Sequence, residues 1–172
     1  MLPNRHDSKL PTPHEFYFRF WGVRGSIASP GPDTHKYGGN TACIEVQVGN
    51  TIIILDGGTG LRRLGTKLVR RPGPQQIHLF LSHLHWDHIQ GIPFFPPAFI
   101  KSNSIHFYGE RKGGQSLQDI LEAQMHPPNF PVPLSVMQAS ISFTEVRSRD
   151  RINLDDDIVI TTTPMNHPKP KK

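Results

Sequence analysis

The sequence of 172 residues is poor in cysteine: Cys43 stands alone. A single cysteine cannot form a disulfide within the chain, which excludes the small secreted proteins that disulfides hold together. A chain with one thiol suits a reducing compartment, so we expect the protein in the cytoplasm.

Long hydrophobic runs are also missing. A helix that crosses a bilayer needs about 20 apolar residues, whereas the longest candidate, IPFFPPAFI at 92–100, is interrupted by three prolines. The N-terminus, MLPNRHDSKLPTPHEF, has charges and prolines where a signal peptide needs a continuous apolar segment. We therefore expect no membrane association.

The chain has 17 prolines, 15 glycines and a formal net charge of +5. Its length suits one domain with many turns. Residues 1–14 show no hydrophobic periodicity and are interpreted as a loose leader, followed by one domain over 15–172. The excess of positive charge would attract RNA or a phosphate ester, although a basic surface explains it equally well.

Apolar periodicity predicts strands that alternate with helices, and therefore an α/β fold in which sheet outweighs helix. A turn at Gly49 and Asn50 predicts a hairpin between two of the strands. Ser116 and Asp119 predict a capping box at a helix start. The predicted strands cover 16–23, 41–48, 51–55, 77–82, 104–110, 141–146 and 156–165, and the predicted helices cover 61–69 and 116–125.

A cluster of titratable residues follows the strand at 77–82. Residues 81–91, LSHLHWDHIQG, contain His83, His85, Asp87 and His88 in the spacing H-x-H-x-D-H. Neutral imidazole and carboxylate together are the ligands of a divalent transition metal. One histidine in a loop would be interpreted as a surface residue, but three beside an aspartate favour a metal site. Protonated imidazoles this close together would repel one another, and a bound cation avoids this repulsion because it requires the neutral form.

At these residues the sequence resembles the metallo-β-lactamase superfamily of metal-dependent hydrolases. IILDGGTG at 53–60 is similar to an earlier motif of that superfamily, and the resemblance implies that Asp56 positions the metal-binding loop from behind the ligands. WGVRGSIASPGPDTHKYGGNTACIEV and HWDHIQGIPFF resemble the bacterial branch related to ribonuclease Z and phosphodiesterases. The resemblance runs from about Phe16 to His167 and implies an αββα sandwich.

The resemblance also implies the ligand sets. His83, His85 and His167 would hold one divalent ion, most simply Zn with Mn or Fe as alternatives, and leave a position open for water. Asp87 and His88 would face a second ion. The bridging aspartate and final histidine of the family pattern have no counterpart before Lys172, so the second site is incomplete.

This missing part predicts that the chain is C-terminally truncated and carries only the first half to two thirds of the sandwich. One sheet would then keep an uncovered apolar face. Such a face needs a partner, and a homodimer that pairs through it is one expectation.

The function implied is hydrolysis of a phosphodiester, of the nucleic-acid or cyclic-nucleotide type, by metal-activated water that Asp87 orients. Because two expected ligands are absent, enzymatic activity itself stays open. One alternative is hydrolysis of a thioester or lactone, since one metal core serves several esters. Another is a catalytically inactive, truncated metal-binding or interaction protein. Pure nucleic-acid binding has only the net charge in its favour.

Overall fold

The computed structural model describes residues 16–155 and 157–166. The leader predicted over 1–14 and the predicted ligand His167 lie outside the described residues. The α/β architecture is confirmed: a six-stranded sheet has the order β1-β2-β3-β4-β5-β6, and a two-stranded sheet pairs β7 with β8. Strands β1 to β3 run antiparallel, and β3 to β6 run parallel.

The strands are β1 (Phe16–Gly22), β2 (Cys43–Val48), β3 (Thr51–Leu55), β4 (Gln76–Phe80), β5 (Ser104–Gly109), β6 (Ser140–Glu145), β7 (Arg151–Asp155) and β8 (Ile158–Thr161). The helices are α1 (Gly60–Leu68), α2 (Trp86–Ile89) and α3 (Leu117–Gln124), with short 3-10 turns η1 (Pro32–Thr34), η2 (Ile92–Phe94), η3 (Pro96–Phe99) and η4 (Leu134–Val136). Among these helices none is long and apolar enough to cross a membrane.

Most predicted elements are present, and two local predictions are confirmed in atomic detail. The turn at Gly49 joins β2 to β3, and this glycine has a φ of 54° that side chains disfavour. At α3, the hydroxyl of Ser116 accepts from the N–H of Asp119, while the Asp119 carboxylate accepts from the N–H of Ser116. Strand β7 is absent from the prediction because its two apolar residues, Ile152 and Leu154, stand in a strongly charged stretch.

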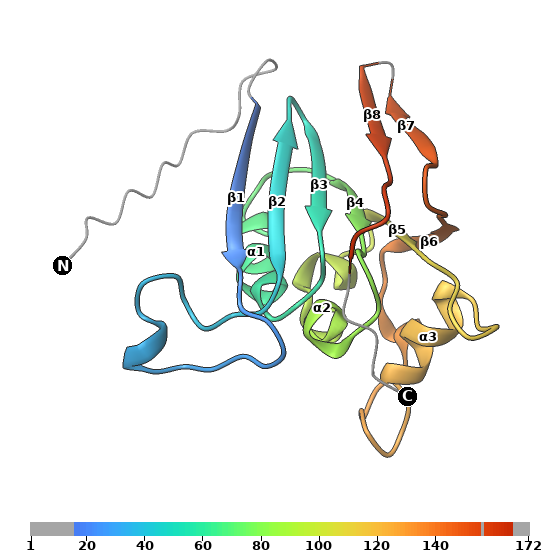
Figure 1. The fold of residues 1–172 in the computed structure, drawn as a ribbon. Helices are drawn as coiled ribbons and strands as arrows, with labels where there is room; N and C mark the ends of the chain where they lie inside the picture. The colour runs from blue at the N-terminus through green and yellow to red at the C-terminus, as the bar shows by residue number, and fades with distance from the viewer. Residues whose placement is uncertain (1–15, 156, 167–172) are drawn as a thin grey trace.

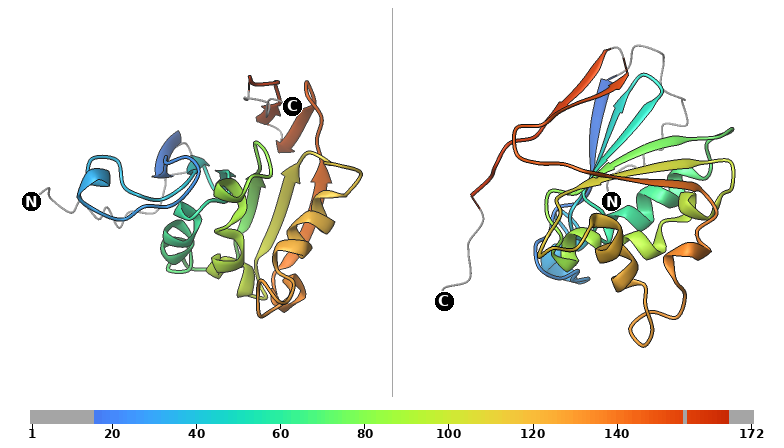
Figure 2. Two further views of the ribbon diagram at one scale, coloured as in Figure 1. Left: turned by 60° about the horizontal axis from the view of Figure 1, so that its bottom comes forward. Right: turned by 90° about the vertical axis from the view of Figure 1, so that its right-hand side faces the viewer.

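The three helices lie on one side of the six-stranded sheet, and the β7–β8 hairpin projects from the other side (Figures 1 and 2). The main core lies between sheet and helices. It contains Ile77, Leu79 and Leu81, which the alternation of this segment predicts on one face. Strand β4 is also covered on its other face, where His78 and Phe80 are buried. Parallel strands in the middle of such a sheet are apolar on both faces for this reason.

The opposite face of the sheet is covered only in part. A small cluster of Ile53, Phe80, Tyr108 and Ile158 joins the sheet to the β7–β8 hairpin. At the far edge, the outward residues of β1 are exposed: Phe16, Phe18 and Phe20 have relative accessibilities of 66%, 60% and 58%. The described part of the chain therefore has the kind of uncovered apolar strip that the sequence predicts.

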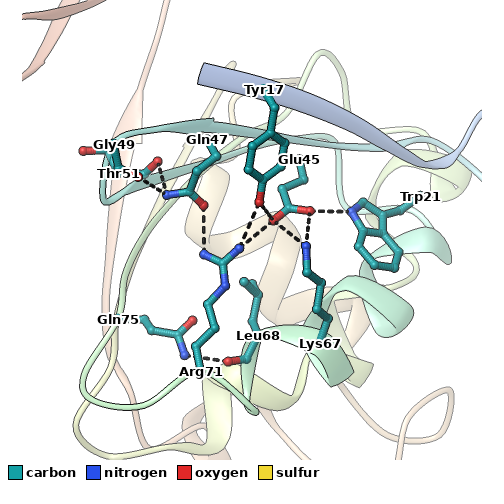
Figure 3. Close-up of polar contacts among 10 residues, drawn as sticks. All are labelled: Tyr17, Trp21, Glu45, Gln47, Gly49, Thr51, Lys67, Leu68, Arg71 and Gln75. Carbon is teal, nitrogen blue, oxygen red and sulfur yellow. Dashed lines mark hydrogen bonds and ion pairs between the residues drawn. The ribbon is translucent and has the colours of Figure 1, made fainter. Parts of the chain in front are cut away.

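The other face of β1 is fixed to α1 by a buried carboxylate (Figure 3). Glu45 of β2 has no exposed side-chain surface, and it accepts hydrogen bonds from Tyr17 (3.0 Å), Trp21 (3.0 Å) and Arg71 (2.9 Å). Lys67 of α1 adds an ion pair at 3.4 Å. Because a buried charge is tolerated only when it is paired, this network fixes the register of two strands against the helix.

Candidate metal centre

The histidine cluster lies at the carboxyl ends of the parallel strands β3 and β4, where open α/β sheets bind their ligands. Asp56 follows β3 directly with a φ of 66°, and its N–H donates to the carbonyl oxygen of Phe80 at the end of β4. The chain leaves β4 through Ser82 and His83, and His85 is the N-cap residue of α2 with extended backbone angles. Two loops that are far apart in sequence thus meet at one edge.

Asp56 contacts the loop that carries the histidine motif. Its Oδ1 accepts from the N–H of Ser82 (2.8 Å), and its Oδ2 accepts from the Ser82 hydroxyl (3.0 Å). The same Oδ2 lies 2.9 Å from Nδ1 of His88. By these contacts Asp56 joins Ser82 and His88 to its own loop; its role in positioning metal ligands stays a prediction. Ser82 was not predicted as a site residue, although its place directly before His83 in the motif is the signal for it.

The imidazoles of the motif are in mutual contact. Nε2 of His83 lies 3.1 Å from Nδ1 of His85, and the ring centroids of His83 and His88 are 4.0 Å apart. Nε2 of His88 lies 3.5 Å from Oδ2 of Asp87. The four predicted residues of H-x-H-x-D-H therefore come together at one point of the surface, half-buried to exposed.

The carboxylate of Asp87 is held by the long loop between β1 and β2. The backbone N–H of Ser26 donates to Oδ2 of Asp87 at 2.7 Å, and Ser26 has a φ of 69°. Partial burial raises the pKa of Asp87, but the Ser26 N–H and the imidazoles of His88 and His83 outweigh it, so the pKa lies below its ordinary value. The sequence did not reveal Ser26, because a backbone donor has no side-chain signature.

Glycines permit the close packing of these two loops. Gly57 donates its N–H to the carbonyl of His88 (2.7 Å) and accepts from the N–H of Gly91 (2.8 Å). A Cβ at Gly91 would lie 2.0 Å from the carbonyl oxygen of Gly58, and one at Gly58 would lie 2.3 Å from that of Asp87. No side chain fits at either position, so the C-terminal end of the histidine motif packs directly against the Asp56 loop.

The ring nitrogens of His83 and His85 are spaced as two ligands of one divalent ion would be. Nitrogen ligands at about 2.0 to 2.1 Å from a tetrahedral ion lie about 3.4 Å apart, close to the 3.1 Å between Nε2 of His83 and Nδ1 of His85. Within residues 16–155 and 157–166 no three histidine, cysteine, aspartate or glutamate side chains are arranged to hold a metal. His167, the predicted third ligand, is outside the described residues, so the ligand assignment stays a prediction.

The chain is similar to known proteins over much of its length. Residues 51–172 match the family described as the beta-lactamase superfamily domain. The chain is 24% identical over 139 residues to a ribonuclease Z of Porphyromonas gingivalis, covering 79% of this chain and 42% of the relative. It is 28% identical over 126 residues to a ribonuclease Z of Haloarcula marismortui, covering 70% and 37%.

Two solved structures share the fold. A diphosphatase from the PhnP family superposes with a TM-score of 0.54 at 14% identity, covering 80% of this chain and 53% of that one. The metallo-beta-lactamase fold protein YhfI from Bacillus subtilis gives a TM-score of 0.54 at 16% identity, covering 84% and 50%. Because the family match covers more than half of the chain, the chain belongs to the metallo-β-lactamase superfamily, and the curated relatives show that it is related to ribonuclease Z. It spans about two fifths of the length of these curated relatives and about half of these structural neighbours.

Proposed function

We propose that this chain carries part of a metal-dependent hydrolase site that acts on phosphodiesters. The observation that supports this most directly is the meeting of His83, His85 and His88 at the strand ends, with Asp56 and Asp87 as the carboxylates that hold them. The ribonuclease Z relatives supply the substrate class, which in this chain is part of the proposal.

The residues have distinct roles in this proposal. His83, His85 and His167 would bind one ion, and Asp87 with His88 would contribute to a second. A bound divalent ion lowers the pKa of a coordinated water to about 7, which makes hydroxide available at neutral pH. Asp87, held by the Ser26 N–H, would accept a hydrogen bond from the nucleophile and fix its direction of attack. Asp56 would keep the loop in place through Ser82 and His88.

Hydrolysis of bis(4-nitrophenyl) phosphate by the purified chain tests the proposal. Turnover should require Zn or Mn, disappear with a chelator and return when metal is added. His85→Ala should abolish it and lower the zinc content. His126→Ala changes an exposed histidine away from the cluster and should leave both unchanged. Metal-loaded, folded protein without turnover would refute the hydrolase.

Asp56→Asn examines the supporting carboxylate separately. Loss of a group that orients ligands typically costs about 10–100-fold in metal affinity or activity. We expect a change of that size in zinc affinity, measured by competition with a chromophoric chelator. An affinity equal to that of the unaltered chain would mean that Asp56 has no part in positioning the ligands.

A second candidate is an interaction protein that pairs through its sheet without catalysis. The exposure of Phe16, Phe18 and Phe20 on β1 favours it, because monomers rarely leave a contiguous apolar strip in water. Sedimentation should then give a dimer that Phe18→Ser dissociates, while Tyr37→Ser, at another exposed aromatic, does not. A monomeric chain would refute this candidate.

A further inference from the structure

A shallow cavity of about 420 Å³ lies on the helical side of the molecule, between α1 and the η2–η3 segment. It is lined by Arg62, Thr66, Phe94, Pro96 and Phe99. None of these residues belongs to the histidine cluster. One wall is closely packed, because Gly65 of α1 lets the η3 prolines approach the helix: a Cβ there would lie 2.5 Å from Cδ of Pro96.

The aromatic part of the cavity is open to solvent. Phe94 is 54% exposed, and its ring meets that of Phe130 edge to face with centroids 5.6 Å apart. This contact holds the Phe94 ring in place without enclosing it. Exposed aromatic rings held in this way are the platforms on which single-stranded nucleic acids stack their bases.

Among the residues that line the cavity, Arg62 is the charged one. The stretch 57–109, which contains α1 and the η2–η3 segment, has six lysines and arginines and one acidic residue, Asp87. Lys67 and Arg71 are paired with Glu45. Arg62 and Arg63 are exposed at the start of α1, and neither is in an ion pair with any residue of the described part. An uncompensated arginine beside an exposed aromatic ring suits a phosphate joined to a base.

We propose that this cavity binds one nucleotide of a single-stranded nucleic acid, with the base stacked on Phe94 and the adjacent phosphate paired with Arg62. Both walls continue directly from the candidate site: Arg62 comes six residues after Asp56, and Phe94 comes six residues after His88. Six residues span at most about 20 Å, so one strand can occupy the cavity and reach the histidines. This inference rests on the proposed function in one respect: the bound strand would be the substrate of the proposed hydrolase.

Binding of a fluorescein-labelled 12-nucleotide 2′-O-methyl oligouridine, followed by anisotropy, tests the site. The strand resists cleavage, so the result does not depend on turnover. We expect Arg62→Glu to weaken binding at least about tenfold, and to reduce the dependence of log K on log salt by about 0.7 for a lost phosphate contact. Arg70→Glu is the matched control: it makes the same charge change just beyond α1, away from the cavity, and should have a much smaller effect.

Phe94 variants examine the stacking. Phe94→Ala should weaken binding of the single strand about fivefold or more, and Phe94→Trp should restore it. The affinity for a duplex of the same length, whose bases are already stacked on one another, should not change with either substitution. The proposal is overturned if the oligonucleotide does not bind, or if the Arg62 and Phe94 variants behave like Arg70→Glu. Binding that depends on both residues in a chain without hydrolysis would uphold this site and refute the hydrolase alone.

Discussion

At the scale of single residues, two carboxylates, Asp56 and Glu45, each accept several hydrogen bonds, but their surroundings are opposite. Asp56 and its neighbours lie at an open edge where water and ligands have access. Glu45 is enclosed between the sheet and α1, with two cations and two aromatic donors around it. An enclosed carboxylate with four partners cannot exchange them for water, so we interpret it as structural.

Removal of this buried charge should be costly. Glu45→Gln leaves Lys67 and Arg71 without their counter-charge, and loss of one partner of a buried pair costs about 3–5 kcal/mol. Because the side chains of Lys67 and Arg71 keep 31% and 15% of their exposure, we expect a smaller loss of about 2–3 kcal/mol in the free energy of unfolding, measured in urea. Glu145→Gln removes the exposed pair with Arg111 and should cost within about 1 kcal/mol. Equal costs would contradict the structural role of Glu45.

The phenol of Tyr17, which donates to Glu45, allows the buried Glu45 network to be followed by titration at alkaline pH. Burial raises the pKa of its phenol above the ordinary 10.0, and the Glu45 charge adds to the effect. The folded state therefore favours the neutral phenol, a contribution that is complete below pH 10 and lost as the pH rises through the folded pKa. Ultraviolet titration of tyrosinate should show a late-ionising group that Tyr17→Phe removes. Ionisation of this group at or below pH 10 in the folded protein would contradict the arrangement.

At the scale of elements, the candidate site is a product of loop packing. The Asp56 loop, the histidine motif and the β1–β2 loop come from three separate stretches of chain, and backbone hydrogen bonds join them. The two points of closest approach are glycines. Rigid strands position these loops, as is usual for binding sites on open sheets.

Gly91→Ala should displace the histidine motif. Its methyl group would meet the Gly58 carbonyl at 2.0 Å, and overpacking of this kind typically costs about 1–3 kcal/mol. We expect a loss of stability in that range, together with weaker zinc binding. Gly25→Ala is the control, since nothing lies within 4 Å of its added Cβ, and it should be close to neutral. If Gly91→Ala binds zinc as tightly as the unaltered chain, the loop contact does not determine the site.

At the scale of the whole molecule, the two faces of the sheet differ in how completely they are buried. The helical face has a continuous core, whereas the opposite face is covered by the β7–β8 hairpin at one end and exposed along β1. Cys43 lies in the helical core with no exposed surface. Burial raises the pKa of its thiol, and the charges of Asp56 and Glu45 raise it further.

Cys43 can therefore report opening of the molecule. A buried, protonated thiol is unreactive, so we expect Ellman's reagent to modify it only when the core opens. The rate of modification should increase with urea in parallel with loss of circular dichroism. As the chain has one cysteine, every modified thiol is this one. Rapid modification in native buffer would mean that the helical core is open or that β2 is displaced.

Much of the fold could be predicted from local pattern. The alternation of β2, the apolar run of β3, the capping box of α3 and the turn at Gly49 each act over a few residues, where propensity and periodicity determine the structure. Strand β7 shows the limit of this reasoning: its pairing with β8 overrides a charged local sequence. The partners of Glu45 show the same limit, because Tyr17 and Arg71 lie 28 and 26 residues from it along the chain.

The sequence by itself determined seven of the strands, the helices α1 and α3, the α/β class, the resemblance to the family, and the presence of an H-x-H-x-D-H motif at a strand end, because all of these are properties of residue types at short spacing. Only the tertiary structure decided that Ser26 holds Asp87, that Ser82 links Asp56 to the motif, and that Arg62 and Phe94 border one cavity. The reason is physical: backbone donors and cavity walls are formed by long-range packing, and they have no local signature in the chain.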